Sequence, residues 1–388
     1  MSQHFDVLVI GGGIVGLTAA LAMAQRHYTV AVIDAGTLMV NTDKSDLRVY
    51  AINKASKMLL SELGVWQHLD DARVAPYNKM HVWDGVSGAY IDFDSRSIAE
   101  PNLGAIIEES ILKQALLRRI SSESKINLFP QSVIDEVCHL ERSIKISGQN
   151  TAWEGQLLMI ADGANSPMRH KLKVDVTTWS YEQQALVATV NSEKSHQNTA
   201  FQVFHPDGPL AFLPLSNLNQ CSIVWSTHAD NAMRLKLLDD NEFSRELTKA
   251  FGGQLGQIKV ASNRHQFPLQ MRHVKQYAGH RWLLLGDAAH TIHPLAGLGL
   301  NVGLADVKSW LTCLEMGKGE LISKKVLGTY QRERKHSVGK LFCLWRDLKD
   351  YLEPPHLLLP HYAVSDCGHA MNLSQLNDYL CARLVVYK

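Results

Sequence analysis

The first 35 residues of the chain contain a pattern that few folds can accommodate. Residues 5–10 (FDVLVI) form a short apolar run rich in valine and isoleucine, which is typical of a buried parallel strand. Glycines follow at once, then residues 14–27 are predicted to form a helix and residues 29–35 (TVAVIDA) a second buried strand. Because parallel strands need a crossover connection, this order predicts a βαβ unit at the start of an α/β protein.

The glycines between the first strand and the helix match the G-x-G-x-x-G pattern, at Gly11, Gly13 and Gly16. In this pattern one glycine allows a tight turn, one lets the backbone approach a diphosphate, and one lets the helix pack on the strand. The helix start, including the backbone of Ile14 and Val15, offers N–H groups to the phosphates. Asp34 ends the second strand, where its carboxylate can accept hydrogen bonds from ribose hydroxyls. The unit predicts a dinucleotide cofactor and leaves open whether this is NAD or FAD.

Composition narrows the class of protein. With 388 residues, the chain is long enough for two or three domains of about 150 residues each. The 39 Lys and Arg residues balance 38 Asp and Glu residues, so the basic excess of a nucleic-acid-binding protein is missing. The six cysteines include no CxxC pair, which favours free thiols in a reducing compartment. The N-terminus does not resemble a secretory signal, and the early apolar run at 14–24 is shorter than the roughly 20 residues of a membrane span. We therefore expect a cytoplasmic protein.

Further along the chain the apolar pattern alternates between the periods of helices and strands. Predicted helices lie at 56–69, at 110–120, near Asn301 and at 326–340, and predicted strands at 80–93, 156–161 and 281–285. Short β-type runs separated by polar turns fill residues 185–267 and indicate an antiparallel sheet. The simplest organisation is one nucleotide-binding domain assembled from three separate stretches, with a second domain inserted between them.

Three later segments resemble a known family. They are DLRVYAINKASKMLLSELGVW at 46–66, ADGANSPMR at 161–169 and GDAAHTIHPLAGLGLN at 286–301. In this order and with these gaps they are similar to the aromatic-ring flavoprotein monooxygenases that have a single FAD domain. The segments RVYAIN, LGVW and HVWD (81–84) resemble the ubiquinone-biosynthesis hydroxylases of that family, which act on polyprenylated phenols. The resemblance covers residues 3–345.

The resemblance implies a fold and a division of the chain. It implies a doubly wound, glutathione-reductase-like α/β domain that binds FAD, and an inserted antiparallel β-sheet domain that binds substrate. The FAD-binding domain would comprise residues 1–70, 101–178 and 272–345, and the substrate domain residues 71–100 and 179–271. The tail at 346–388 departs from the family, because Pro354, Pro355 and Pro360 interrupt its apolar pattern.

The resemblance also implies an activity. NAD(P)H, as a transient co-substrate, would reduce FAD, and O2 would then be used to hydroxylate the ring of a lipophilic phenol on the route to ubiquinone. The cofactor carries this chemistry, so no catalytic acid or base is predicted. Two alternatives stay open: an FAD-dependent prenyl reductase of the same fold, and a non-catalytic flavoprotein subunit of a biosynthetic complex. Peripheral contact with the inner face of the membrane, contact with such a complex and homo-oligomer formation also stay open.

Four residues in these segments are implied to contact the cofactor through their side chains or the turns that carry them. Gly286 and Asp287 match the Gly-Asp motif, whose carboxylate holds a ribityl hydroxyl of FAD; Asp287 as a helix cap is the alternative. Asp162 matches the Asp-Gly motif linked to FAD and pyridine nucleotide, with an ordinary Asp-Gly turn as the alternative. Arg48 matches the arginine near the flavin, with a surface arginine as the alternative.

The start of the helix near Asn301 is implied to place backbone N–H groups beside the flavin pyrimidine, where reduction builds negative charge. The residues implied in this role are Pro294, Gly297, Gly299, Leu300 and Asn301. The family commonly has a glutamine between the two glycines, whereas this chain has Leu298. The backbone contacts are expected to survive this difference.

Three remaining groups of residues are predicted to have structural roles. His290 and His293 lie near Asp287 but lack a familiar zinc spacing, so no metal site is predicted. The basic stretch RERK at 332–335 is predicted to be a solvated helix face, with contact to anionic lipid as the alternative. Four aromatic residues of the β-rich region are predicted to lie in a core rather than in a ligand pocket, at Phe201, Phe204, Phe212 and Trp225.

Overall fold

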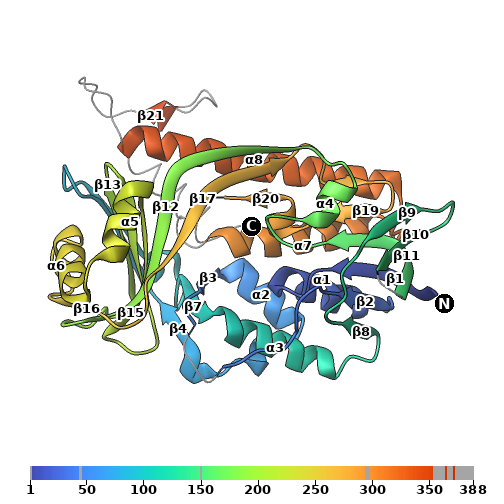
Figure 1. Ribbon diagram of the computed structural model, residues 1–388, viewed down its shortest axis with the longest axis horizontal. Coiled ribbons are helices and arrows are strands. Elements are labelled where there is room, and N and C mark those ends of the chain that lie inside the picture. The colour runs from blue at the N-terminus through green and yellow to red at the C-terminus, as the bar shows by residue number, and fades with distance from the viewer. Residues whose placement is uncertain are drawn as a thin grey trace.

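The computed structural model describes residues 2–42, 46–148, 151–292 and 298–352, and two short paired strands, β21 (Ala363–Val364) and β22 (Ala370–Met371). Within these residues the chain forms two large sheets, one three-stranded sheet and the two-stranded sheet of β21 and β22. The two large sheets occupy opposite ends of the molecule in Figure 1, and the long strands β12 (Val176–Ser192) and β17 (His265–Val274) run from one end toward the other.

The eight-stranded sheet has the predicted βαβ unit at its centre. Strand β1 (Ser2–Ile10) is parallel to β2 (Val30–Ile33) on one side and to β11 (Thr151–Ile160) on the other. The remaining strands are β8 (Ile126–Phe129), β9 (Glu136–His139), β10 (Ile144–Gly148), β18 (Ala278–Gly279) and β19 (Trp282–Leu284). All of β2 and the last four residues of β1 are buried, which accounts for their continuous apolar sequence. Three distant stretches of the chain therefore meet in one sheet.

Four long helices share one hydrophobic core with this sheet. They are α1 (Ile14–Ala24), α3 (Glu109–Ser121), α7 (Leu298–Met316) and α8 (Lys324–Leu352). Helix α1 is buried on nearly all sides, because β1 and β2 lie on one side of it and α3 and α7 contact it as well. The predicted helices at these four places are confirmed with shifted ends. Helix α8 continues past residue 346, where the tail was predicted to begin, and the three tail prolines lie outside the described residues.

A small antiparallel sheet lies next to this core. It consists of β3 (Val49–Asn53), β4 (Val74–Tyr77) and β7 (Gly104–Glu108), with β7 in the middle. The predicted helix at 56–69 is divided into α2 (Lys54–Glu62) and the 3-10 turn η1 (Trp66–His68), because Gly64 takes a positive φ of +72°. The other short helices are η2 (Asp71–Arg73), η3 (Ser95–Ile98), α4 (Pro167–Lys171) and η4 (Gly286–Ala288).

The nine-stranded sheet contains most of the region that was predicted to be antiparallel. Besides β12 and β17 it contains β5 (Lys79–Asp84), β6 (Tyr90–Asp94), β13 (Thr199–His205), β14 (Gly208–Pro214), β15 (Gln220–His228), β16 (Ile258–Val260) and β20 (His290–Thr291). Neighbouring strands are antiparallel except β13 and β5, which are parallel. The predicted strands at 80–93 thus join a sheet whose other strands lie more than 80 residues later.

Two helices interrupt this β-rich region and were missed by the sequence analysis. They are α5 (Ala229–Leu237) and α6 (Asp240–Ala250), which lie at the outer end of the molecule (Figure 1). Their buried side chains share a second core with the sheet, in which the rings of Phe212 and Phe251 stack 3.8 Å apart. The predicted core role of the aromatic residues is confirmed for Phe212 and Trp225, which are buried in this core.

Among the helices that the structure describes, none is both long enough and apolar enough to cross a lipid bilayer.

Candidate functional site

The glycines of the opening turn allow two close backbone approaches. Gly11 has a φ of +105°, and a Cβ atom at this position would lie 2.3 Å from the carbonyl oxygen of Ala161, at the end of β11. A Cβ atom at Gly16 would lie 2.0 Å from the carbonyl oxygen of Gly11. These two residues are glycines because β1, α1 and the end of β11 pack through their backbones.

Gly13 differs from these two, since no other atom lies within 4 Å of the position of its missing Cβ atom. It is also the N-cap residue of α1, and no side chain caps this helix. The open position and the uncapped helix start leave room and backbone donors for a negatively charged group. A diphosphate fits this cradle, and the contacts predicted for Gly13, Ile14 and Val15 stay predictions.

Asp34 supports the turn from the end of β2. Its Oδ2 atom accepts a hydrogen bond from the Gly12 N–H (2.5 Å), and its Oδ1 atom accepts one from the Gly36 N–H (2.7 Å). Each carboxylate oxygen has two lone pairs, so both can accept a further hydrogen bond from a ribose hydroxyl. The predicted ribose contact is compatible with this geometry and stays a prediction.

The predicted segment that begins at Gly286 lies directly against the start of α1. The side chain of Val15 on α1 is 3.2 Å from the position of a Cβ atom at Gly286 and 2.8 Å from one at Gly303 on α7. Gly286 takes a φ of +58°, which favours glycine. Two parts of the chain that are about 270 residues apart in sequence therefore form one site.

Asp287 lies in the 3-10 turn η4, whose N-cap is Leu285, so the alternative role of Asp287 as a helix cap is wrong. The residue is half-buried, and no described residue forms a hydrogen bond with its carboxylate. Burial raises the pKa of the Asp287 carboxyl, and the nearby charges of His290 and Arg48 partly oppose this shift. A hydroxyl-bearing ligand would satisfy this carboxylate.

Arg48 precedes β3, and its charge acts on the Asp287 carboxyl. Its side chain is 64% exposed, lies over the ring of Tyr50 at 5.3 Å, and has its Nε atom 3.9 Å from Glu109. Because an exposed guanidinium contributes little to stability through such a contact, Arg48 remains available to a ligand. The predicted flavin contact stays a prediction.

The Asp-Gly motif follows β11 and is connected to the Asp287 turn by a residue that the sequence analysis did not single out. Asp162 accepts a hydrogen bond from the Met168 N–H (3.0 Å), so its carboxylate supports the start of α4. Arg169 on α4 is buried, and its guanidinium donates to the carbonyl oxygens of Ala164 and Ala288, each at 2.9 Å. Arg169 therefore joins the two motifs through backbone oxygens.

The start of α7 is attached to the small sheet. The side-chain amide of Asn301 is buried, donates to the carbonyl oxygen of Ala51 (2.6 Å) and accepts from the Asn53 N–H (3.0 Å). Leu300 packs against the core beside it, and the position of a Cβ atom at Gly299 is open. Pro294 and Gly297, together with His293, lie outside the described residues.

One residue has surroundings that differ from those predicted. Arg334, in the middle of the RERK stretch, is buried and pairs with Asp306, so the prediction of a solvated face is wrong at this position. Its neighbours Arg332, Glu333 and Lys335 are exposed. His290, which the sequence analysis considered only as a metal ligand, also contacts Asp306. Asp306 was missed because its partners are distant in sequence.

His273 on β17 lies beside His290 in the β17–β20 ladder and provides a test by pH. Burial, together with the charges of His290 and Lys335, lowers the pKa of His273 to about 4. Since this lies below the ordinary value of about 6.5, the neutral form stabilises the fold, and the contribution is lost as pH falls from about 6.5 toward the folded pKa. We expect the urea midpoint to fall across this range, and to fall less in His273→Gln. The exposed His265 on the same strand provides the control variant His265→Gln. If the urea midpoint falls equally with pH in the unchanged protein and in both variants, the expectation is contradicted.

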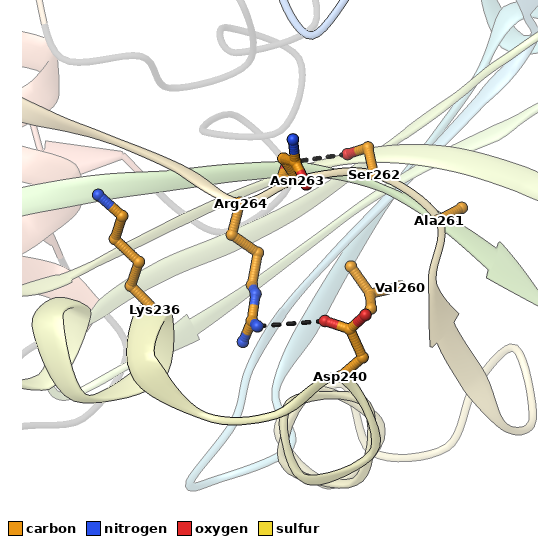
Figure 2. A pocket seen from close by; sticks show the side chains of 7 residues that line it. All are labelled: Lys236, Asp240, Val260, Ala261, Ser262, Asn263 and Arg264. Carbon is orange, nitrogen blue, oxygen red and sulfur yellow. Dashed lines mark hydrogen bonds and ion pairs between the residues drawn. The ribbon is translucent and has the colours of Figure 1, made fainter.

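A surface hollow of 510 Å³ lies elsewhere, between α5, α6 and the start of β17 (Figure 2). Its arginine, Arg264, donates to the carbonyl oxygens of Leu235 (3.0 Å) and Leu238 (2.6 Å) and to the carboxylate of Asp240 (3.1 Å). These bonds fasten the two helices to the sheet. The helices that border the hollow, α5 and α6, lie far from α1 at the outer end of the molecule (Figure 1), so the hollow is not part of the candidate site.

Comparison with known proteins agrees with the geometry. The family described as FAD binding domain matches residues 4–343. The 3-demethoxyubiquinol 3-hydroxylase of Escherichia coli (strain K12) is 34% identical over 340 residues, which cover 86% of this chain and 86% of that protein. The mitochondrial ubiquinone biosynthesis monooxygenase COQ6 of Homo sapiens is 31% identical, and the match covers 87% of this chain and 83% of that protein.

Solved structures with the same fold include PqsL from Pseudomonas aeruginosa, with a TM-score of 0.77 and 20% identity, covering 91% of this chain and 97% of that chain. The p-nitrophenol 4-monooxygenase PnpA from Pseudomonas putida DLL-E4 has a TM-score of 0.69 and 19% identity, covering 86% of this chain and 85% of that chain. At these identities the similarity shows a shared α/β fold with mixed sheets.

Proposed function

The chain belongs to the FAD binding domain family, and from this membership we propose that it is an FAD-dependent monooxygenase that hydroxylates the ring of a polyprenylated phenol in ubiquinone biosynthesis. The observation that carries the proposal is the contact between the opening turn and the Gly286–Asp287 turn through Val15. This contact places an open diphosphate cradle and a half-buried carboxylate in one site. The names of the similar proteins favour neither a prenyl reductase nor a non-catalytic subunit.

The residues of the chain would divide the binding of FAD between them. The turn at Gly13 and the start of α1 would hold the diphosphate, Asp34 the ribose and Asp287 the ribityl chain. Burial raises the pKa of the Asp287 carboxyl and the charge of Arg48 partly opposes this rise, so Arg48 would lie close enough to balance negative charge near the flavin. When bound, FAD supplies electron transfer and oxygen chemistry, and the protein supplies orientation and exclusion of water.

We further propose NAD(P)H as the electron donor and a two-domain organisation with a glutathione-reductase-like FAD-binding domain. Residues 1–70, 101–178 and 272–345 would form that domain, 71–100 and 179–271 the inserted substrate domain, and 346–388 a tail. The presence of separate hydrophobic cores under the eight-stranded and nine-stranded sheets supports this division.

A polyprenyl tail partitions into lipid, so we also propose that the protein works peripherally at the membrane surface. Flotation of the purified protein with liposomes would support this proposal, and recovery of all of the protein in the lipid-free fraction would contradict it. Homo-oligomer formation and contact with a biosynthetic complex also stay proposals.

The experiment that tests the proposed function uses purified protein, a prenylated phenol and isotopically labelled O2. We expect flavin absorbance, NADH or NADPH oxidation that increases with the phenol, and a product that carries one labelled oxygen atom. Asp287→Ala is expected to lower the flavin content, whereas Asp207→Ala, in the exposed β13–β14 turn, is expected to leave it unchanged.

Three outcomes would contradict the proposal in different ways. A protein that neither contains nor binds FAD would remove its basis. A product with a reduced prenyl chain and no labelled oxygen would favour the reductase, and binding of FAD without phenol-dependent NAD(P)H oxidation would favour the non-catalytic subunit.

A further inference from the structure

A buried group of charged side chains lies beneath the turn that carries Asp287. Asp306 on α7 is 0% exposed, His290 on β20 is 1% exposed and Arg334 on α8 is 2% exposed. The Oδ2 atom of Asp306 accepts hydrogen bonds from the backbone N–H of Gly286 (2.7 Å) and from Nε2 of His290 (2.8 Å). Its Oδ1 atom accepts from Nε of Arg334 (2.5 Å). One carboxylate thus contacts three elements of the core.

These bonds hold both ends of one short turn. Gly286 begins the turn, His290 ends it, and Asp287 lies between them with a carboxylate that no described residue binds. The middle of the turn is held separately by Arg169, which donates to the carbonyl oxygen of Ala288. The backbone that carries Asp287 is therefore fixed at three points, while the Asp287 side chain is left for a ligand.

Arg334 gives the buried carboxylate its countercharge. Its Nη2 atom also donates to the carbonyl oxygen of Val302 on α7 (3.3 Å), so the guanidinium connects α8 to α7. Burial alone would raise the pKa of the Asp306 carboxyl, but the charges of His290 and Arg334 and the hydrogen bonds lower it below its ordinary value. Asp306 is therefore a carboxylate at neutral pH and can accept all three hydrogen bonds.

We propose that Asp306 is a positioning residue for the cofactor: it holds Gly286 and His290 so that Asp287 faces the ribityl chain of FAD, and Arg334 supplies its countercharge. The inference rests on the proposed function, because it assumes that FAD binds at Asp287. It extends the site to α8, because Arg334 on α8 acts on the binding of FAD through the buried carboxylate of Asp306. A residue with a purely structural role would change the stability of the fold and leave the FAD affinity of the folded protein unchanged.

The test compares Asp306→Asn with Glu315→Gln, which makes the same acid-to-amide change near the exposed end of α7. FAD is removed from each protein and its dissociation constant is measured by quenching of flavin fluorescence, alongside the visible spectrum of bound FAD and the urea midpoint of the apoprotein. An amide keeps the shape of the carboxylate but replaces one acceptor by a donor, which opposes one of the three existing donors. We expect Asp306→Asn to bind FAD about tenfold or more weakly with an altered flavin spectrum, and Glu315→Gln to match the unchanged protein.

His290→Gln provides a second variant that releases only one end of the turn, so it tests the proposal if Asp306→Asn fails to fold. We expect it to weaken FAD binding by a smaller factor than Asp306→Asn. Folded variants that bind FAD as tightly as the unchanged protein, with the same spectrum, would overturn the positioning role. If the unchanged protein itself binds no FAD, the proposed function fails instead, so the two failures are distinguishable.

Discussion

Replacement of Gly16 by alanine is expected to destabilise the fold by about 3 kcal/mol and to remove FAD binding at the same time. The new methyl group would lie 2.0 Å from the carbonyl oxygen of Gly11, and this neighbour is backbone that cannot rotate away. To relieve the contact, α1 must move away from β1 and so displace the helix start that faces the cofactor. Urea denaturation and the flavin content of the purified protein measure the two effects.

Replacement of Gly13 by alanine is the matched control, because the same methyl group would enter open space. We expect the stability of the apoprotein to change by less than about 0.5 kcal/mol and the FAD affinity to fall about a hundredfold, since the methyl group fills the diphosphate cradle. If Gly13→Ala binds FAD normally, the diphosphate does not lie on this turn. If Gly16→Ala keeps its stability, the helix is not held by the backbone contact.

Replacement of Arg334 by methionine is expected to destabilise the protein by about 3–5 kcal/mol, because it leaves the fully buried Asp306 carboxylate without its guanidinium. The control is Arg332→Met, two residues earlier on α8, where the side chain is exposed. That change is expected to stay within about 0.5 kcal/mol. Denaturant unfolding of both variants measures the difference, and equal effects would show that burial of the ion pair has no energetic importance.

The pH dependence of these variants supplies a second readout. The folded pKa of Asp306 lies below its ordinary value of about 3.9, so its contribution to stability is present above that pH and is lost as pH falls through the folded pKa. Removing Arg334 removes one of the charges that lower the pKa. The folded pKa of Asp306 then rises toward its unfolded value, so the stability that Asp306 loses as the pH falls below about 3.9 should be smaller in Arg334→Met than in the unchanged protein.

The βαβ unit and the glycine turn could be predicted because their determinants are local. A buried parallel strand needs a continuous apolar run. Glycine is needed at position 16 because it lies against the backbone of Gly11 in the same motif, and at position 11 because it lies against the backbone of Ala161, which follows the neighbouring strand. The ends of α2 depend on a positive φ at Gly64, which the apolar pattern alone does not indicate.

Helices α5 and α6 were missed because the residues before and after them have the short apolar runs that are typical of strands. The start of α6 did carry a signal, since the side chain of Asp239 accepts a hydrogen bond from the Glu242 N–H, which is a helix cap at the expected spacing. Arg334 could not be distinguished from its charged neighbours, because the carboxylate that it pairs with lies 28 residues earlier on another helix. The contact depends on how α7 and α8 pack, and no local pattern encodes this.

Because α8 comes late in the chain, the core that it completes can form only late during translation. Besides Arg334, the helix contributes the Tyr330 hydroxyl, which donates to the carbonyl oxygen of Leu284 (2.7 Å), and the side-chain oxygen Oε1 of Gln331, which accepts from the Tyr277 N–H (3.1 Å). A ribosome exposes β1 and β2 roughly 300 residues before these side chains leave the exit tunnel. The nascent chain must keep its central strands from aggregating throughout that interval, and the proposed flavin site can be completed only after α8 has been synthesised.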